Sequence, residues 1–370
     1  FEDDLRHINT ESDSEVLLNV FAHELQNFGK FRIGPGDIFR AVERVHERCS
    51  GGYSAVAMIT GVGIVAFRDP YGIRPIVFGK RETAEGTDYI VASESVAIDA
   101  LDFELIRDLS PGEVIFISKE GEVDTYLYAA AKHYAPCIFE HVYFARPDSY
   151  VFGESVNDIR TNLGRRLASE SPVEADVIVP IPDSGVCGAV GYSEASGVPM
   201  RMGLIRNHYV GRTFIEPSQA IRHFGVKVKL NPVKSILEGK RVVLVDDSII
   251  RGTTSRKIVK MVRSVGAREV HMRIGCPPTI SPCYYGIDTP QRSELIAATN
   301  SLEEVREYLG ADSLAYLSLD GLLGLVKDKR ESSCRSCFTG EYPVEIPKDE
   351  EAYLQLALKL NNDRSGQVKS

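Results

Sequence analysis

Two neighbouring acids, Asp246 and Asp247, stand between an apolar run and a stretch of small residues. The run at 242–245 is typical of a buried strand, and RGTTS at 251–255 is typical of a turn that opens a helix. Free N–H groups and hydroxyls at such a helix start can bind a phosphate. Adjacent carboxylates suit sugar hydroxyls, directly or through Mg²⁺. The pattern predicts a sugar-phosphate site; the alternative is a helix cap beside solvated acids.

A second polar turn follows another apolar run. The segment VPIPDSGVCGAVGY at 179–192 places Asp183, Ser184 and Gly185 directly after a strand-like stretch. A Pro-rich turn with Ser and Gly is weak evidence by itself, so its value depends on the first motif.

A long basic connection lies between these two motifs. Residues 201–241 hold nine Lys or Arg against two Asp or Glu, and the segment 206–222 is long for a connection in a compact sheet. We interpret it as a lid that faces a polyanion and excludes water when it closes, with Arg206, Tyr209 and Arg212 directed at the ligand. A solvated loop or a contact with another subunit is the alternative.

The elements around these motifs predict two architectures. Helices at 14–28 and 36–48 precede clustered strands, which indicates a layered α+β region; those strands are expected at 53–59, 63–68, 76–79, 89–93 and 113–118. Later, apolar strands alternate with helices, including one at 253–265, which indicates a doubly wound parallel sheet; its strands are expected at 176–182, 199–205, 241–247 and 268–274. A polar tail with a helix near 349–360 ends the chain.

Composition excludes several classes of protein. The 370 residues carry 52 Asp or Glu and 43 Lys or Arg, a net charge of −9, which argues against a general nucleic-acid binder. No stretch reaches 18 apolar residues, so we predict no membrane span. Seven cysteines are too few for a disulfide framework in a chain of this size, and we predict a reducing compartment.

Four of the cysteines are candidate metal ligands. Cys334 and Cys337 form a C-x₂-C pair, which by itself fits zinc, a redox pair or coincidence. Cys137 and Cys283 are the other candidates. Four thiolates suit a [4Fe–4S] cluster or tetrahedral zinc. Cys49, Cys187 and Cys276 are expected to be ordinary small buried residues.

Several long runs carry a resemblance to a known family. The run at 242–255 resembles the phosphoribosyl diphosphate (PRPP) signature of type I phosphoribosyltransferases. The whole chain resembles the amidophosphoribosyltransferase family, through INTESDSE (8–15), AFRDPYGIRPIVFGKR (66–81), VASESVAID (91–99), CIFEHVYFARPDS (137–149) and RNHYVGRTFIEP (206–217).

The resemblance implies a fold and a reaction. It implies a partial αββα glutaminase domain of the N-terminal-nucleophile class at 1–130, a phosphoribosyltransferase domain at 131–328 and a tail at 329–370. Glutamine nitrogen would be released as ammonia and transferred to C1 of PRPP. The products would be 5-phosphoribosylamine, glutamate and pyrophosphate, in the first committed step of purine synthesis. A cytoplasmic homotetramer inhibited by purine nucleotides is the family expectation.

The resemblance also implies roles for individual residues. Asp13 would hold the α-ammonium group of glutamine; the alternative is a helix cap. Mg²⁺ would be held by Ser184, Asp246 and Asp247. PRPP would contact Ser184, Gly185, Arg206, Tyr209, Arg212, Asp246, Asp247, Ser248, Arg251, Gly252, Thr253, Thr254 and Ser255. The cluster-bearing type in the family resembles this chain at Cys137, Cys283, Cys334 and Cys337, so a [4Fe–4S] cluster with a structural role is expected.

One departure from the family pattern leads to a further expectation. The family's glutaminase nucleophile is an amino-terminal Cys whose α-amine acts as base, and this chain starts with Phe1. We therefore expect an N-terminally truncated piece that uses ammonia and not glutamine. The alternative functions are a nucleobase phosphoribosyltransferase and a PRPP-binding transcription regulator; the first domain argues against the former, and the lack of a helix-turn-helix pattern argues against the latter.

Overall fold

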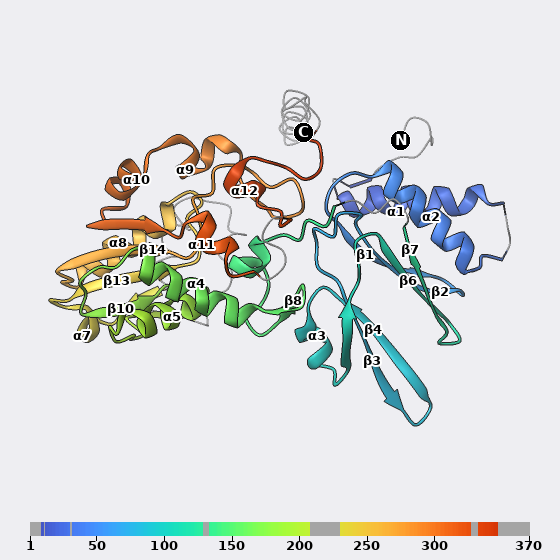
Figure 1. Cartoon of the computed structure of the whole chain (residues 1–370), viewed down its shortest axis with the longest axis horizontal. Coiled ribbons are helices and arrows are strands. Elements are labelled where there is room, and N and C mark those ends of the chain that lie inside the picture. Colours follow the sequence, from blue (N-terminus) through green and yellow to red (C-terminus); the bar gives the residue numbers. More distant parts are fainter. Residues whose placement is uncertain are drawn as a thin grey trace, which may run out of the picture.

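The computed structural model describes residues 9–10, 12–29, 32–128, 133–207, 230–326 and 332–346. The amino-terminal region with two antiparallel sheets lies beside a larger region built on a parallel sheet (Figure 1). The predicted domain boundaries near 130 and 328 both fall outside the described residues and stay predictions. The expected tail helix near 349–360 also lies outside them.

The first region is layered, with two helices on a four-stranded sheet. The helices are α1 (Asp13–Asn27) and α2 (Pro35–Arg48), as predicted. The sheet has the order β1-β2-β6-β7, with strands β1 (Ser54–Ile59), β2 (Gly63–Arg68), β6 (Glu113–Ser118) and β7 (Val123–Leu127). A second sheet has the order β4-β3-β5, with strands β3 (Val77–Thr83), β4 (Gly86–Ala92) and β5 (Glu104–Asp108), and the helix α3 (Ser95–Asp99) follows β4.

Alternation along β2 explains how the first region is layered. Val65 and Phe67 belong to the core shared with α1 and α2, whereas Ala66 belongs to a separate core with Phe78 of the second sheet. Successive side chains of a strand point to opposite faces, so one strand serves both cores. The order of layers is therefore helix, sheet, sheet.

The second region is a doubly wound parallel sheet, as predicted. Its strands run in the order β10-β13-β14-β15 and all pair in parallel. The strands and their principal helices are α4 (Val156–Glu170), β10 (Val177–Pro180), α5 (Val186–Ser196), β13 (Arg241–Asp246), α8 (Thr253–Ser264), β14 (Glu269–Ile274), α10 (Leu302–Leu309) and β15 (Ser313–Tyr316). Met200 adds a parallel bridge to Ile178 on the outer side of β10. The chain therefore runs outward from β10, returns to β13 and continues the other way.

The predicted strand at 199–205 is confirmed only in part. Only Met200 pairs with the parallel sheet, and Leu204–Arg206 forms β11, which pairs antiparallel with β12 (Leu230–Pro232) in a separate two-stranded sheet. Gly203 separates the two pieces, and a Cβ there would come within 2.8 Å of the Val179 side chain. The apolar run is thus divided between two sheets, which its composition did not indicate.

Shorter elements complete the description. They are η1 (Glu140–Phe144, a π-helix), β8 (Tyr150–Val151), β9 (Glu154–Ser155), α7 (Lys234–Leu237), η3 (Arg292–Glu294), α9 (Ile296–Thr299), α11 (Leu319–Leu323) and α12 (Ser336–Thr339).

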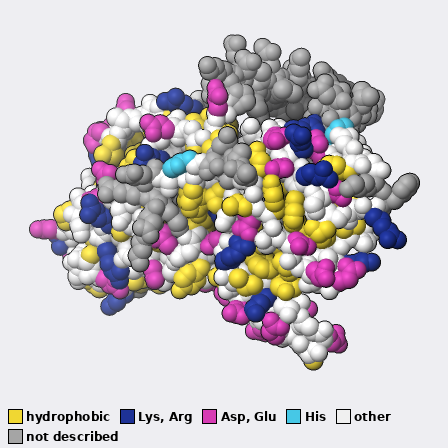
Figure 2. All heavy atoms as spheres, turned by 45° about the vertical axis from the view of Figure 1, so that its right-hand side comes forward, with side chains coloured by type: hydrophobic (Ala, Val, Ile, Leu, Met, Phe, Trp, Pro, Cys, Tyr) yellow, Lys and Arg dark blue, Asp and Glu magenta, His cyan; other side chains and the backbone are white. Residues whose placement is uncertain are grey.

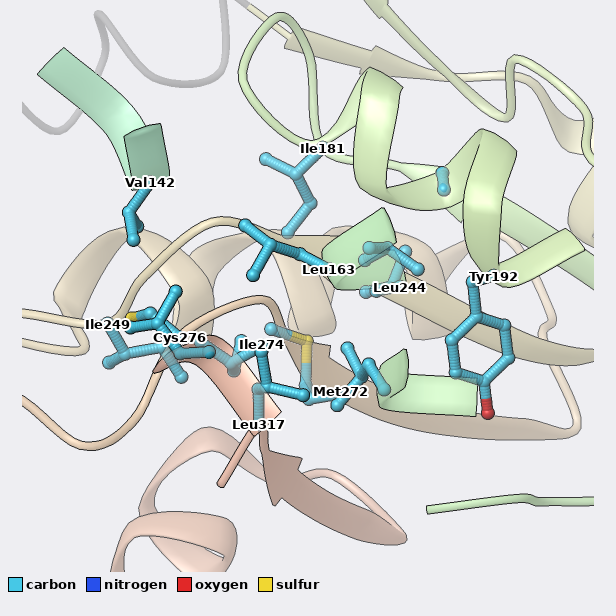
Figure 3. Close-up of a cluster of buried hydrophobic side chains, with 14 of the residues drawn as sticks. Val142, Leu163, Ile181, Tyr192, Leu244, Ile249, Met272, Ile274, Cys276 and Leu317 are labelled. Carbon is cyan, nitrogen blue, oxygen red and sulfur yellow. The ribbon is translucent and has the colours of Figure 1, made fainter. Parts of the chain in front are cut away.

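The main core surrounds the parallel sheet. Leu244, Met272, Ile274 and Leu317 lie within it (Figure 3), and Ile73 of the first region also belongs to this core. Acidic and basic side chains are interspersed on the face shown in Figure 2, with hydrophobic side chains gathered near its middle. Among the helices of the described ranges, none combines the length and apolar character needed to cross a bilayer.

Candidate functional site

The strand order defines one edge of the parallel sheet as the place for a ligand. From β10 the chain goes through α5 to the Met200 side, whereas from β13 it goes through α8 to β14. Right-handed crossovers in opposite directions put their helices on opposite faces, and sheets of this topology bind ligands in a crevice at that point, which here is at the carboxyl ends of β10 and β13. Both polar turns predicted from sequence begin at these two strand ends.

The turn after β10 is held tightly against β13. The N–H of Ile181 donates to the carbonyl oxygen of Val245 at 2.9 Å, and a Cβ on Gly185 would lie 2.2 Å from the same oxygen. Only glycine allows this approach without displacement. Asp183 is exposed and Ser184 is partly buried, and the peptide bond between Pro182 and Asp183 is cis.

The turn after β13 brings the two acids together. The N–H of Asp247 donates to Oδ1 of Asp246 at 3.0 Å, and the Ser248 hydroxyl donates to Oδ2 of Asp247. Burial raises the pKa of Asp246 well above its ordinary value, and the Asp247 carboxylate adds to this shift. A cation or a sugar diol between the carboxylates would relieve their repulsion, so the pair suits Mg²⁺ or ribose hydroxyls.

The start of α8 supplies the expected anion-binding geometry. Gly252 precedes it with φ of 70°, and a Cβ there would lie 2.8 Å from the Ile296 side chain. The first helical hydrogen bond runs from Arg256 N to Gly252 O at 2.9 Å. Gly252 has no side chain to cap the amides that follow it, and Thr253 and Thr254 are exposed while Ser255 is buried. These amides are therefore available to a phosphate.

Two arginines that were predicted to contact PRPP have different partners in the structure. Arg206 on β11 forms an ion pair with Asp183, so the structure brings Arg206 to the turn after β10. Arg251 instead pairs with Glu294 at 2.8 Å, and both side chains are about half exposed. An exposed pair of this kind contributes little stability, so a phosphate could compete for Arg251. Tyr209 and Arg212 lie outside the described residues.

Asp13 lies in the first region and not at the two turns of the parallel sheet. It is the first residue of α1 and is exposed, so its position also fits the alternative of an acid at a helix start. Beside it, the Glu15 carboxylate accepts hydrogen bonds from the N–H groups of Asn9 and Thr10 at 2.8 and 2.7 Å. The chain entering α1 is therefore held against the helix start.

The four candidate cysteines converge from three segments. Cys137 and Cys334 are partners in a parallel bridge, in which Cys334 N donates to Pro136 O and Ile138 N donates to Cys334 O. The carbonyl of Cys337 accepts hydrogen bonds from Ile280 and Ser281, next to Cys283. Burial raises the pKa of the Cys337 thiol, and the nearby thiols of Cys276, Cys334 and Cys283 add to this shift.

This convergence does not form a single-ion site. Across the described ranges, no three His, Cys, Asp or Glu side chains are grouped so that they could hold one metal ion. The arrangement therefore gives no support to tetrahedral zinc, whose four ligands must meet at one point.

Arg160 is a buried charged residue that the sequence motifs missed. It lies buried on α4 and donates to the carbonyl oxygens of His141, Glu140 and Ala145 at 2.8, 3.2 and 2.8 Å. Burial lowers the pKa of Arg160, and the charge of Asp247 opposes this effect. The available signal was a charged residue on an apolar helix face, four positions after the buried Val156.

Known proteins share both the motifs and the fold. The family model described as "Phosphoribosyl transferase domain" matches residues 153–276, which include both turns. An amidophosphoribosyltransferase of Pseudomonas aeruginosa is 50% identical over 98% of this chain and 74% of its own length. One from Archaeoglobus fulgidus is 47% identical over 94% of this chain and 74% of its own. A chloroplastic relative from Arabidopsis thaliana is 50% identical over 91% of this chain and 57% of its own.

A solved structure agrees with these relatives. The glutamine PRPP amidotransferase of Bacillus subtilis, complexed with ADP and GMP, matches with a TM-score of 0.82 and 43% identity, over 94% of this chain and 74% of that chain. The parallel sheet and its two turns thus define a phosphoribosyltransferase. The chain as a whole belongs to the amidophosphoribosyltransferase family.

Proposed function

We propose that the crevice at the ends of β10 and β13 binds PRPP with Mg²⁺ and transfers ammonia nitrogen to C1 of the sugar. The chain belongs to a family that catalyses the first committed step of purine biosynthesis, which supports an amidotransferase over a nucleobase phosphoribosyltransferase or a transcription regulator. The observation that carries the proposal is the meeting of the Gly185 turn and the Asp246–Asp247 turn at one topological switch point.

Each part of the crevice has a proposed role. Asp246 and Asp247 would hold the ribose hydroxyls and Mg²⁺, and the first turn of α8 from Gly252 would hold the 5-phosphate. Ser248 and Arg251 would assist there. Ser184 and Gly185, with Arg206, Tyr209 and Arg212, would face the pyrophosphate, with Ser184 also close to Mg²⁺. The Arg206–Asp183 ion pair supports this assignment for Arg206.

The proposed reaction is a substitution at the anomeric carbon. The ammonia lone pair forms the C1–N bond while the C1–O bond to pyrophosphate breaks, and the nitrogen then loses a proton to give the amine. Mg²⁺, when bound, neutralises charge on the departing pyrophosphate. The chain positions the sugar by its diol and phosphate and stabilises the charge that leaves. Neutral ammonia needs no general base to attack.

We further propose a [4Fe–4S] cluster on Cys137, Cys283, Cys334 and Cys337. Support comes from the bridge between Cys137 and Cys334 and from the effect of the Cys334 and Cys283 thiols on Cys337, which bring cysteines of three segments near one another. A cluster has four iron atoms and does not need its thiols to meet at one point, unlike a single zinc ion. Bound there, it would hold the tail against the second region and the segment at Cys137.

We also propose a glutamine contact, a class of inhibitor and an oligomeric state. Asp13 is proposed to hold the glutamine α-ammonium. Purine nucleotides are proposed as inhibitors, because the B. subtilis structure is a complex with ADP and GMP. A homotetramer is proposed from the family resemblance. The cytoplasm stays the predicted compartment, although plant relatives are named as chloroplastic.

Pyrophosphate release tests the proposed function directly. The chain is incubated with PRPP, Mg²⁺ and NH₄⁺, and formation of pyrophosphate and of the phosphoribosyl amine is followed together. Both products should appear, and both should be lost in Asp246→Asn. Because NH₄⁺ supplies the nitrogen, this assay does not depend on glutamine hydrolysis. A parent chain that neither binds nor consumes PRPP would therefore contradict the proposal.

A further inference from the structure

One short segment contacts both the paired acids and the cysteine cluster, by which we mean Cys137, Cys283, Cys334 and Cys337. Residues 275–281, GCPPTIS, follow β14. At one end, Gly275 N donates to the carbonyl oxygen of Asp246 at 2.8 Å. At the other end, Ile280 N and Ser281 N donate to the carbonyl oxygen of Cys337 at 2.9 and 3.2 Å. Backbone hydrogen bonds therefore link Asp246, which is proposed to bind the sugar, to Cys337, which is proposed to bind the cluster, through residues 275–281.

The sequence makes this segment stiff. Pro277 and Pro278 fix φ near −65°, and the residue before each proline is restricted to extended backbone. Consecutive prolines form an extended helix that transmits displacement along its axis instead of folding. The segment also has no room to bend, because Cys276 and Thr279 are 0% and 1% exposed.

The near end of the segment lies directly on the acid turn. A Cβ on Gly275 would lie 3.5 Å from Asp246 O and 3.8 Å from Asp247 O, so the two backbones are in contact. The Cys276 thiol donates to Pro277 O at 3.2 Å and shares the main core with Ile249, two residues after Asp247 (Figure 3). A shift of this segment would therefore move the Asp246–Asp247 peptide.

We infer that residues 275–281 form a rigid strut through which the cysteine cluster positions Asp246 and Asp247 for PRPP. The inference rests on the proposed function of both sites and adds the coupling between them. The strut residues are positioning residues that do not touch the substrate. Loss of a cluster ligand should therefore weaken PRPP binding at the other end, and softening the strut should remove that dependence.

A double-mutant cycle tests the coupling. The first change is Cys337→Ser, and the second is Pro277→Gly together with Pro278→Gly. PRPP affinity in the presence of Mg²⁺ is measured by titration calorimetry on the full chain, without ammonia or glutamine. We expect Cys337→Ser to weaken PRPP binding about tenfold in the parent and less than about twofold in the softened strut, the size typical of coupled sites.

Controls separate this inference from the proposed function. Pro172→Gly changes an exposed proline outside the strut and should leave the tenfold effect intact. Failure of the parent to bind PRPP, or unchanged binding in Asp246→Asn, would contradict the proposed function. If the parent binds PRPP and the effects of the cysteine and proline changes on PRPP affinity are additive, the strut inference is overturned and the proposed function is not.

A second measurement covers variants that fold poorly. Hydrogen exchange at the Gly275 amide is compared between the parent and Cys337→Ser, because this amide donates to Asp246. Faster exchange at Gly275, with no change at Val245 in the neighbouring strand, supports the strut. Equal exchange at Gly275 in both proteins contradicts it. Pro277→Ala with Pro278→Ala is the milder variant for the same cycle.

Discussion

Gly185 lies against Val245 so closely that a Cβ on Gly185 would stand 2.2 Å from the Val245 carbonyl oxygen. Gly185 lies in the turn after β10, and Val245 is the β13 residue directly before Asp246, so the contact joins the two sides of the proposed site. Their contact fixes the distance between the proposed pyrophosphate turn and the proposed diol acids. Any side chain at position 185 must separate them.

The first prediction concerns this contact. Gly185→Ala should force the two turns apart, lower stability by about 1–3 kcal/mol and raise the KM for PRPP more than the KM for ammonia. Gly188→Ala, on the same helix, is the matched control, because its Cβ would meet Val245 Cγ1 at an ordinary 3.4 Å. Melting curves and initial rates measure both effects. Equal behaviour of the two alanine variants would disprove the close approach.

The second prediction concerns the stability of the acid pair. Burial raises the pKa of Asp246, so its charged form is disfavoured in the folded protein without ligand. The raised pKa lowers the free energy of unfolding as pH rises above the ordinary value near 3.9. Asp246→Asn should therefore be more stable than the parent at neutral pH, while PRPP binding weakens by roughly tenfold to a hundredfold.

Asp176 is the control of opposite sign. Its hydrogen bonds from Arg241 lower its pKa to about 2, so its stabilising contribution is present above its unfolded pKa and is lost as pH falls through about 2. Asp176→Asn should be less stable than the parent at neutral pH and should bind PRPP normally. Unfolding titrations of both variants at several pH values check the two signs. A loss of stability in both variants would contradict the assignment for Asp246.

The third prediction concerns His46 in the first region. Burial lowers the pKa of His46 to about 4, and its Nδ1 lies 2.9 Å from the Tyr53 hydroxyl. The unfolded chain binds the proton more readily, so the free energy of unfolding should fall by about 3 kcal/mol at most as pH drops from 6.5 to 4. His46→Gln should flatten this slope in denaturant titrations. The exposed His133→Gln should leave it unchanged, and an unchanged slope in His46→Gln would exclude this cause.

The fourth prediction concerns the cysteine cluster. Cys334→Ser should remove bound iron and sulfide from anaerobically purified protein, because Cys334 is one of the four proposed ligands and its backbone pairs with that of Cys137. Cys49→Ser is the control, since Cys49 packs in the separate core of α1 and α2. The amounts of iron, acid-labile sulfide and zinc bound per chain are all measured. Parent protein that contains zinc and lacks sulfide would disprove the [4Fe–4S] proposal.

The local sequence alone determined the two motifs and most of their elements. The apolar run before Asp246, the small residues from Gly252 and the periodicity of α1 and α2 predicted strand, turn and helices correctly. These features depend on residues near one another in the chain, so periodicity and turn chemistry report them.

Tertiary structure decided which distant residues meet. It placed Gly185 on Val245, divided 199–205 between two sheets, directed Arg160 to carbonyl oxygens of η1 and joined Asp246 to Cys337 through residues 275–281. The physical reason is that these contacts arise from strand order and close packing between segments far apart in sequence. No local pattern specifies which strand lies beside which, and a single glycine or buried arginine acquires its role only from that neighbour.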